Sequence, residues 1–338
     1  MSSSADHQRV AVTIEALLGR PPLGLSRVGG GGNNRLYRAE MADGPVAVKC
    51  YFRHPSDPRD RQAVEMAALT FLDRHGLLGV PRPIATDAAA GIAIQSWVEG
   101  TPIAERRDDD IDAMAAFAAR LHELGRHPVA AVLPLASEAC LSGAELVNQL
   151  VCRLARLQEA VSLDSELGDF ITNILAPHIM AAQDTNRFES DLAPNLRTLS
   201  PSDFGTHNAL RRSDGTLTFL DFEYFGWDDP VKLTADVLLH PGMRLSRTEQ
   251  VRYLRSALRT YATDPAFPTR LCAFHPLISL RWALIVLNPF LPERWARQHF
   301  ATGAEREHVL RTQLSKARHY AALDPTRLTA ILDEANGP

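Results

Sequence analysis

The sequence is poor in lysine, in cysteine and in long apolar segments. Only three of its 36 basic residues are lysines (Lys49, Lys232 and Lys316), so arginine carries nearly all of the positive charge. The four cysteines lie far apart without a CxxC pair, which argues against a disulfide scaffold or a zinc knuckle and fits a reducing compartment. The longest apolar run, residues 282–287, is too short to cross a bilayer, and the first residues lack the profile of a signal peptide. We therefore expect a soluble cytoplasmic protein with no membrane partner.

The chain also lacks an overall positive charge. Its 338 residues carry a formal charge of −4, from 36 basic and 40 acidic side chains, so no global field favours nucleic acid. The charge is unevenly distributed, because residues 241–338 hold 14 basic and 8 acidic residues, a balance of +6. With 45% hydrophobic and 22% charged residues, the composition is that of an ordinary globular protein of about two lobes.

The first part of the chain has the pattern of a small sheet with one helix. Over residues 23–52, LSRV precedes a glycine-rich turn, and RLYRAEM and PVAVKCYF flank a hairpin signal at Asp43-Gly44. A helix is expected over residues 58–75, because apolar residues recur at helical spacing and Gly76 is a good helix stop. The segment VPRPIATD is broken by prolines and leads to a further strand, GIAIQSWV.

Beyond residue 100 the pattern becomes mainly helical. EGTP looks like a linker, helices are expected over residues 141–182, and residues 199–226 combine a polar loop with two short apolar strands. We predict an α+β, bilobal protein: a small β-rich N-terminal lobe over residues 1–97, and a larger, mainly helical lobe over residues 98–338.

A glycine-rich turn, Gly29 to Gly32, separates the first two expected strands and is followed by Asn33 and Asn34. Glycines let the backbone approach a phosphate closely and leave N–H groups free to point at it. The spacing fits neither GxGxxG nor a Walker A loop, so a plain surface loop is an open alternative.

A lysine ends the apolar strand Val46-Ala47-Val48-Lys49. Burying its charge is costly unless it is paired, and Glu65 on the following helix is an available partner. Kinase-like folds use such a pair to hold the α- and β-phosphates of a nucleotide. The alternative is a solvated lysine at a strand end.

Two acids and an amide further along the chain are candidate catalytic or metal-binding residues; two of them lie in a polar loop and one at a strand end. Asp203 and Asn208 are five residues apart in SDFGTHN: the carboxylate can orient a hydroxyl and take its proton, and the amide oxygen can bind a metal ion. Asp221 follows the apolar residues of FLDFE, at a place where Mg²⁺ can sit. Taken singly, these residues could equally form a turn and cap a strand.

Together, the glycine loop, strand lysine, helix glutamate, Asp-x4-Asn pair and strand aspartate have the order of a phosphoryl-transfer site. The sequence resembles the aminoglycoside phosphotransferase and choline kinase group of small-molecule kinases, which share the protein-kinase-like fold. The resemblance covers roughly residues 25–240 and rests on GGGGNNRLYRAE, VAVKCYF, IQSWVEG, AARLHEL, SPSDFGTHN and LDFEY.

This resemblance implies that the N-terminal lobe, residues 1–97, binds the nucleotide and that the lobe of residues 98–338 is catalytic and binds the acceptor. It also implies ATP and Mg²⁺ as cofactors, and a role for each motif residue. Asp203 takes the role of catalytic base, and Asn208 and Asp221 those of magnesium ligands. The nucleotide-binding positions that it implies are Gly30, Gly31, Gly32, Asn33, Lys49, Glu65, Gln95 and Trp97.

Two positions depart from the family pattern. The histidine that usually stands two places before the base is Pro201, and the histidine two places after it is Gly205. The segment DDPVKLTAD resembles the family segment in which an aspartate, here Asp236, braces the catalytic loop by hydrogen bonds.

The expected reaction is transfer of the ATP γ-phosphoryl group to a hydroxyl of a small molecule, such as a sugar, a sugar-like compound or an amino alcohol. The arginine excess of residues 241–338 argues against a highly cationic acceptor and favours a neutral or anionic one. A nucleotide-binding pseudokinase or regulator with little turnover is the alternative. A protein kinase is disfavoured because HRD and an APE-ended segment are absent from the sequence, and because the expected metal-binding acid, Asp221, is not part of a DFG triplet.

Overall fold

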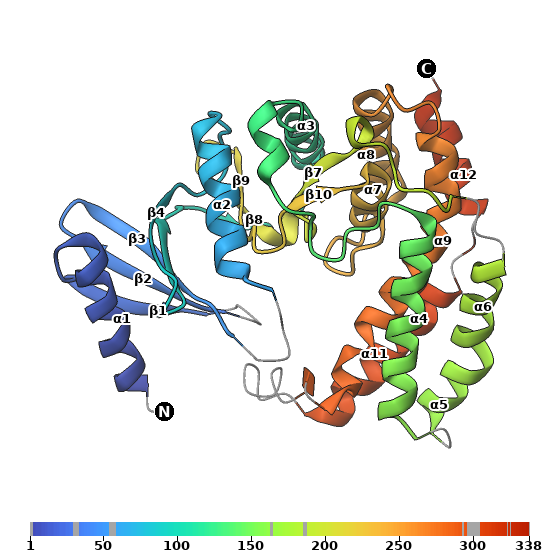
Figure 1. The fold of residues 1–338 in the computed structure, drawn as a ribbon, viewed down its shortest axis with the longest axis horizontal. Helices are drawn as coiled ribbons and strands as arrows, with labels where there is room; N and C mark the ends of the chain where they lie inside the picture. The colour runs from blue at the N-terminus through green and yellow to red at the C-terminus, as the bar shows by residue number, and fades with distance from the viewer. Residues whose placement is uncertain are drawn as a thin grey trace.

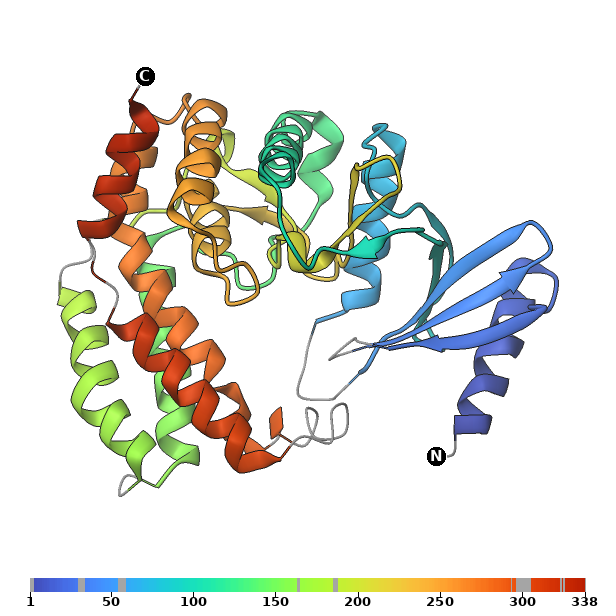
Figure 2. The same ribbon diagram turned by 180° about the vertical axis from the view of Figure 1, so that it is seen from behind.

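The computed structural model divides into an N-terminal antiparallel sheet with two helices and a mainly helical remainder, as the α+β prediction required (Figures 1 and 2). The structure describes residues 3–29, 34–53, 59–162, 165–184, 188–292, 294–295, 305–322, 324 and 326–337.

Five strands form the N-terminal sheet, in the order β1-β2-β3-β5-β4. They are β1 (Gly24–Val28), β2 (Arg35–Met41), β3 (Gly44–Cys50), β4 (Pro83–Asp87) and β5 (Ile92–Ser96). The predicted strands before and after the Asp43-Gly44 turn are present as β2 and β3, paired in antiparallel register. The proline-containing segment that the sequence pattern left as an interruption forms β4 at the sheet edge, where a proline at the first strand position is tolerated.

Alternation along β3 divides its side chains between two faces. Val46 and Val48 belong to a buried apolar cluster with Val10 and Ile14 of helix α1 (Ser3–Leu18), which the sequence analysis did not anticipate. Lys49 directly follows Val48 and therefore points to the opposite face. In Figure 1, α1 covers the outer side of the sheet, and α2 (Arg61–Arg74) lies between the sheet and the rest of the molecule.

Helix α2 begins and ends much as expected. Asp60 caps its start by accepting a hydrogen bond from the backbone N–H of Ala63 (3.0 Å). The chain leaves the helix at Gly76, which has a φ of +66°, a conformation that glycine adopts without strain. Glu65 is buried on this helix, 1% exposed.

Helices and short strands alternate in the remainder of the chain. The helices are α3 (Asp108–Gly125), α4 (Gly143–Ala160), α5 (Glu166–Phe170), α6 (Ala176–Asp184), α7 (Pro230–Leu239), α8 (Arg247–Thr260), α9 (Phe267–Val286), α11 (Arg306–Ala321) and α12 (Thr326–Asn336). Short 3₁₀ turns are η1 (Pro128–Val132), η3 (Pro194–Leu196), η4 (Thr206–Asn208) and η5 (Asn288–Phe290), and η2 (Ile171–Leu175) is a π-helical turn. The strands are β6 (Thr101–Pro102), β7 (Thr198–Ser200), β8 (Ala209–Arg211), β9 (Leu217–Phe219) and β10 (Gly226–Asp228).

These short strands position two polar loops. β8 and β9, the two short apolar strands predicted within residues 199–226, form a hairpin around Asp214-Gly215. β6, which the sequence pattern assigned to a linker, pairs with β8. β7 pairs with β10 and leads into residues 201–208, whereas β9 leads into residues 220–225. Both loops that carry predicted site residues therefore start at strand ends.

Helix α9 lies in the core of this helical part. The segment Phe267–Phe290 is long and apolar enough to cross a membrane by length and composition, but 61% of its most apolar window is buried inside the protein. Arg270 of this helix forms an ion pair with Asp229, and Arg281 lies 3.4 Å from Asp236. These buried contacts are those of a core helix.

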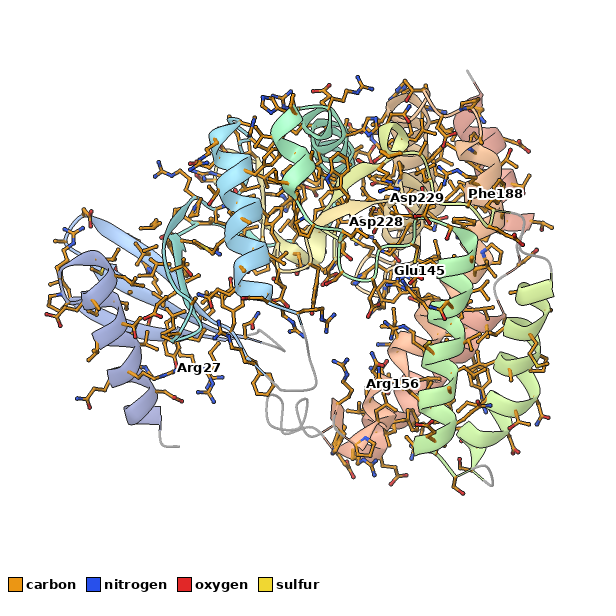
Figure 3. The ribbon with its side chains drawn as sticks, viewed as in Figure 1. Arg27, Glu145, Arg156, Phe188, Asp228 and Asp229 are labelled. Carbon is orange, nitrogen blue, oxygen red and sulfur yellow. The ribbon has the colours of Figure 1, made fainter. Side chains whose placement is uncertain are left out.

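The start of α7 is fixed by buried charges. Asp228 and Asp229, labelled in Figure 3, lie together where β10 joins this helix. Lys232, which is completely buried, lies 2.8 Å from Asp228 Oδ2 and 3.1 Å from Asp236 Oδ2. A buried ammonium between two carboxylates meets the condition under which a charge is retained inside a protein.

Candidate active site

The ammonium group of Lys49 lies among three carboxylates. Its Nζ is 2.6 Å from Glu65 Oε2, 2.7 Å from Asp221 Oδ1 and 3.6 Å from Glu223 Oε2. The lysine–glutamate pair expected from the sequence is thus present, and the Lys49 side chain is only 12% exposed. It is not the solvated strand-end lysine of the alternative interpretation.

The electrostatics of this cluster favour a cation. Burial, opposed by the charge of Lys49 and reinforced by those of Glu223 and Glu65, raises the pKa of Asp221 to about 6. Burial by itself would lower the pKa of Lys49, but the three carboxylates outweigh it and raise that pKa above its ordinary value. One ammonium therefore does not fully compensate three neighbouring carboxylates.

Further donors hold the carboxylates of Glu65 and Glu223 in place. Glu65 accepts hydrogen bonds from Tyr51 Oη (2.6 Å) and from the backbone N–H of Phe222 (3.4 Å). Glu223 accepts one from Asn34 Nδ2 and lies 3.5 Å from Arg61 Nη1.

Neither Tyr51 nor Glu223 was predicted as a site residue. A signal for Glu223 existed, because an acid two positions after Asp221 points to the same side if the chain is extended.

Asp203 lies beside two imidazoles. Its Oδ1 is 2.8 Å from His207 Nε2 and 3.2 Å from His240 Nε2, and the two rings stack with centroids 3.9 Å apart and planes at 6°. Burial opposes ionisation of Asp203, but the hydrogen bonds from both histidines hold its pKa below the usual range. The group is therefore a carboxylate at neutral pH, ready to accept a further hydrogen bond.

The backbone of residues 201–208 is fixed by short-range hydrogen bonds. Ser202 adopts a φ of +68°, and its N–H donates to Ser200 Oγ (3.0 Å). Asn208 donates from Nδ2 to the carbonyl of Asp203 (3.0 Å), and its own carbonyl accepts from the N–H of Leu220 (2.8 Å). The loop that carries Asp203 is thereby joined to the residue next to Asp221.

One of the two departures from the family motif, Gly205, has a structural explanation. A Cβ atom on Gly205 would lie 2.6 Å from both His207 Nδ1 and Met243 Sδ, so the side chain of His207 fills the space that a residue at 205 would occupy. His207 and His240 supply the imidazole contacts to Asp203 in this chain. His240 is 37 residues from Asp203 in the sequence, which is why local motif reading missed it.

Asp236 does not brace this loop as the resemblance had implied. Its carboxylate accepts a hydrogen bond from Trp282 Nε1 (2.9 Å) and is close to Lys232 and Arg281. Within the described ranges, no hydrogen bond joins it to residues 201–208. Its influence is indirect, because the Trp282 ring packs edge-on against His240 with centroids 4.8 Å apart.

The remaining predicted nucleotide-binding residues fall into two groups. Gln95 pairs with Ala47 on β3, is 6% exposed, and its Nε2 has no hydrogen-bond partner in the part of the chain that the structure describes. Trp97 donates from Nε1 to Glu99 (2.8 Å), and the Arg38 guanidinium lies 5.1 Å from its ring centroid. Gly30, Gly31, Gly32 and Asn33 lie outside the described residues.

The polar groups present fit a nucleotide and a divalent cation. Glu65, Asp221 and Glu223 each offer a carboxylate oxygen, and these oxygens lie within 4.8 Å of one another. Asn208 uses its Nδ2 inside the loop, so its Oδ1 is left without a partner among the described residues. Carboxylate and amide oxygens are ligands that Mg²⁺ prefers, and the unpartnered amide of Gln95 is a donor available to a bound molecule.

The fold and this site define a bilobal kinase-like protein, with a paired lysine on a five-stranded sheet facing acids on loops of the helical part. The chain belongs to the phosphotransferase enzyme family, whose sequence profile matches residues 24–271. It is therefore a phosphotransferase. No curated protein matches the chain.

Solved structures of kinases from this group share the fold. The choline kinase LicA from Streptococcus pneumoniae is 15% identical, with a TM-score of 0.59 over 94% of this chain and 99% of that one. Spectinomycin phosphotransferase APH(9)-Ia, in complex with ADP and spectinomycin, is 11% identical, with a TM-score of 0.62 over 94% and 98%. The gentamicin–APH(2")-IIa complex is 14% identical, with a TM-score of 0.60 over 96% and 97%.

Proposed function

We propose that this protein transfers the γ-phosphoryl group of ATP to a hydroxyl of a small molecule, with Mg²⁺. The observation that carries the proposal is the contact of Lys49 with both Glu65 and Asp221, at 2.6 and 2.7 Å. It joins the predicted phosphate-binding lysine to a predicted metal ligand that is 172 residues away in the sequence. Nucleotide use is further supported by similar structures that contain ADP or AMP.

Lys49 and the carboxylates around it (Glu65, Asp221 and Glu223) would bind the phosphate donor. Lys49, held by Glu65, steadies the α- and β-phosphates, and Gln95 contributes an amide donor towards the nucleotide. Asp221 and Asn208 would hold Mg²⁺, which when bound neutralises charge between the β- and γ-phosphates.

The acceptor half falls to Asp203. Because the contacts with His207 and His240 keep it ionised, its carboxylate can orient a hydroxyl in line with the phosphate and take its proton. Most of the rate enhancement then comes from positioning and electrostatics rather than covalent chemistry. Four free cysteines, two of them buried, fit a reducing cytoplasmic location for this activity.

Titration calorimetry with ATP, with and without Mg²⁺, tests the donor site. We expect Mg²⁺ to tighten binding by about tenfold or more in the wild type, and Asp221→Ala to lose that gain because it removes a metal ligand. Asp214→Ala, on the exposed β8–β9 turn, is the matched control and should behave as the wild type.

The results separate the kinase from the alternatives. Absence of nucleotide binding by the wild type contradicts the proposed function. Magnesium-dependent binding without turnover on any acceptor favours the pseudokinase, for which the changes at Pro201 and Gly205 are the motivating observation.

A further inference from the structure

A cavity of about 460 Å³ lies beside the proposed catalytic loop. It is bounded by the end of α7, the start of α8, and parts of α9, α11 and α12, which gather on the side of the molecule away from the five-stranded sheet (Figure 1). His240 belongs to its wall, and the same imidazole lies 3.2 Å from Asp203 Oδ1. The cavity and the proposed base are thus separated by one side chain, and the volume suits a small ligand.

The charge of the lining is positive. Arg244, Lys316 and Arg327 contribute cations, and Asp324 is the one acid in the described lining. The carboxylate of Asp324 accepts hydrogen bonds from the N–H and Oγ1 of Thr326 (2.9 and 2.8 Å). In the described part of the chain, none of the three cations forms an ion pair with a carboxylate.

The lack of a carboxylate partner sets the three cations apart from their neighbours, although Arg244 Nε donates a hydrogen bond to the carbonyl of Pro241 (3.3 Å). Elsewhere in the C-terminal third, side chains paired with carboxylates include Arg247, Arg252, Arg270, Arg281, Arg311 and Arg318. The contrast holds for the lysines too: Lys49 and Lys232 each contact two or more carboxylates, and Lys316 contacts none among the described residues. Unpaired cations gathered on one cavity wall create a positive potential that selects anions.

A buried imidazole adds a second, independent pointer to a ligand. His275 of α9 is 9% exposed and lines the cavity, and no hydrogen bond to its ring is present within the described ranges. Burial and the neighbouring Arg327 lower the pKa of His275 to about 4, so at neutral pH the ring is uncharged and can still donate one hydrogen bond. A buried polar group without a partner normally has one supplied by water or a ligand.

We infer that this cavity holds an anionic group of the acceptor, a phosphate ester or a carboxylate, bound by Arg244, Lys316 and Arg327, so that the acceptor is a negatively charged hydroxyl compound. The inference rests on the proposed function, since it assigns the cavity to the acceptor of that reaction. A cationic acceptor would meet the like charge of the wall, which costs affinity. An anion held there places the rest of a small molecule next to His240 and within reach of Asp203.

Binding of inorganic phosphate tests the anion site directly. The protein is first saturated with MgADP, and phosphate is then titrated into the wild type, into the double variant Lys316→Met/Arg327→Met and into Arg311→Met. Arg311 lies on the same helix as Lys316 but outside the cavity, and its side chain is 72% exposed, so it controls for loss of surface charge. We expect one phosphate per chain, bound about tenfold or more weakly by the double variant and unchanged by the control.

The outcomes distinguish failure of the anion site from failure of the proposed kinase function. Failure of MgADP to bind contradicts the proposed function. MgADP binding with no phosphate bound, or with phosphate bound equally by all three proteins, overturns the anion site and leaves the kinase assignment standing. A phosphate lost in Asp221→Ala but retained in the double variant occupies the nucleotide site and also overturns the inference.

Matched sugars then identify the anionic group and its link to the acceptor. Glucose 6-phosphate, glucuronate, glucose and glucosamine present one framework with a phosphate ester, a carboxylate, no charge and a positive charge. We expect one of the first two to displace phosphate about tenfold more effectively than glucose, and whichever does so identifies the group. An affinity that does not rise with negative charge, or that is highest for glucosamine, contradicts an anionic acceptor.

Discussion

Asp203 is oriented by aromatic side chains that reach back into the core. The stacked rings of His207 and His240 contact its carboxylate, Trp282 packs on His240, and Asp236 accepts the indole N–H. The base therefore depends on residues from α7 and α9 as well as on its own loop. Such support limits the motion of a group that must meet its substrate within a few tenths of an ångström.

Replacing the proposed base tests this arrangement at the level of chemistry. Asp203→Asn keeps the shape of the side chain but cannot accept a proton, so kcat should fall by about 10²- to 10⁴-fold. Calorimetric affinity for MgADP should stay at the wild-type value, because Asp203 is not among the nucleotide contacts. A variant that retains full kcat shows that another group takes the proton.

Contacts between residues close in the sequence could be predicted, and contacts between distant residues could not. Lys49 and Glu65 are 16 residues apart, on a strand and the next helix, and their contact follows from charge and burial. The contact of His240 with Asp203 depends on how α7 packs against the loop, and no periodicity reports that packing. For the same reason, the sequence showed that Gly205 departs from the family pattern but not that the side chain of His207 occupies the space beside it.

Helix α7 depends on buried charge. Lys232 lies between Asp228 and Asp236, and Asp228 also accepts hydrogen bonds from the N–H groups of Cys140 (3.0 Å) and Asp229 (2.9 Å). The ammonium therefore joins the end of β10 to the middle of the helix that presents His240.

Removing this ammonium should destabilise the fold strongly. Lys232→Met leaves the buried Asp228 without its cation and Asp236 with Arg281 alone, which is expected to lower the free energy of unfolding by about 3–5 kcal/mol. Urea denaturation at pH 7 measures the change, with Lys316→Met as a control expected to lie within about 0.5 kcal/mol of the wild type. Adding Asp228→Asn to Lys232→Met should recover part of the loss; a larger loss would contradict the charge explanation.

Strands and helices whose apolar residues recur at a regular spacing were predicted from the sequence. The short strands at the edges of sheets were not. β2, β3, α2 and the β8–β9 hairpin follow from alternation, helical spacing and turn residues. β4 and β6 exist because a neighbouring strand offers backbone partners, a tertiary condition that overrides local proline signals.

At the scale of the whole molecule, several contacts between the N-terminal sheet region and the helical part converge on one short segment. Asp221 receives Lys49, and Glu223 receives Asn34 and Arg61. The position of one part relative to the other is therefore coupled to the groups proposed to bind the metal and the phosphates. The sequence predicted the two-lobed plan, but the convergence on residues 221–223 needed the three-dimensional structure.

A second set of ion pairs couples the stability of the whole molecule to pH. Glu138 pairs with Arg153 of α4 and with Arg281 of α9 (2.9 Å). Burial opposes its ionisation, but the two arginines outweigh this and lower the pKa of Glu138 to about 2. A carboxyl with a lowered folded-state pKa stabilises the fold fully above its ordinary pKa of 4.5, and the contribution is lost as the pH falls from there towards 2.

Comparing Glu138→Gln with the wild type at two pH values tests this linkage. The wild type should be more stable by about 1 kcal/mol at pH 7, because the carboxylate is partly exposed, and the difference should shrink at pH 3. Urea unfolding free energies provide the measurement, and Glu159→Gln on the exposed side of α4 should show no such pH dependence. A difference that is equal at both pH values would assign the effect of Glu138 to packing.

The scarcity of lysine has a practical consequence for chemical labelling. Two of the three ammonium groups are shielded, with exposed side-chain fractions of 12% for Lys49 and 1% for Lys232. An amine-selective reagent at mildly alkaline pH will therefore react, apart from the α-amino group, chiefly at Lys316. A fluorophore or cross-linker can be placed on the wall of the cavity in the unmutated protein, where the yield of conjugation reports directly on whether the cavity is filled.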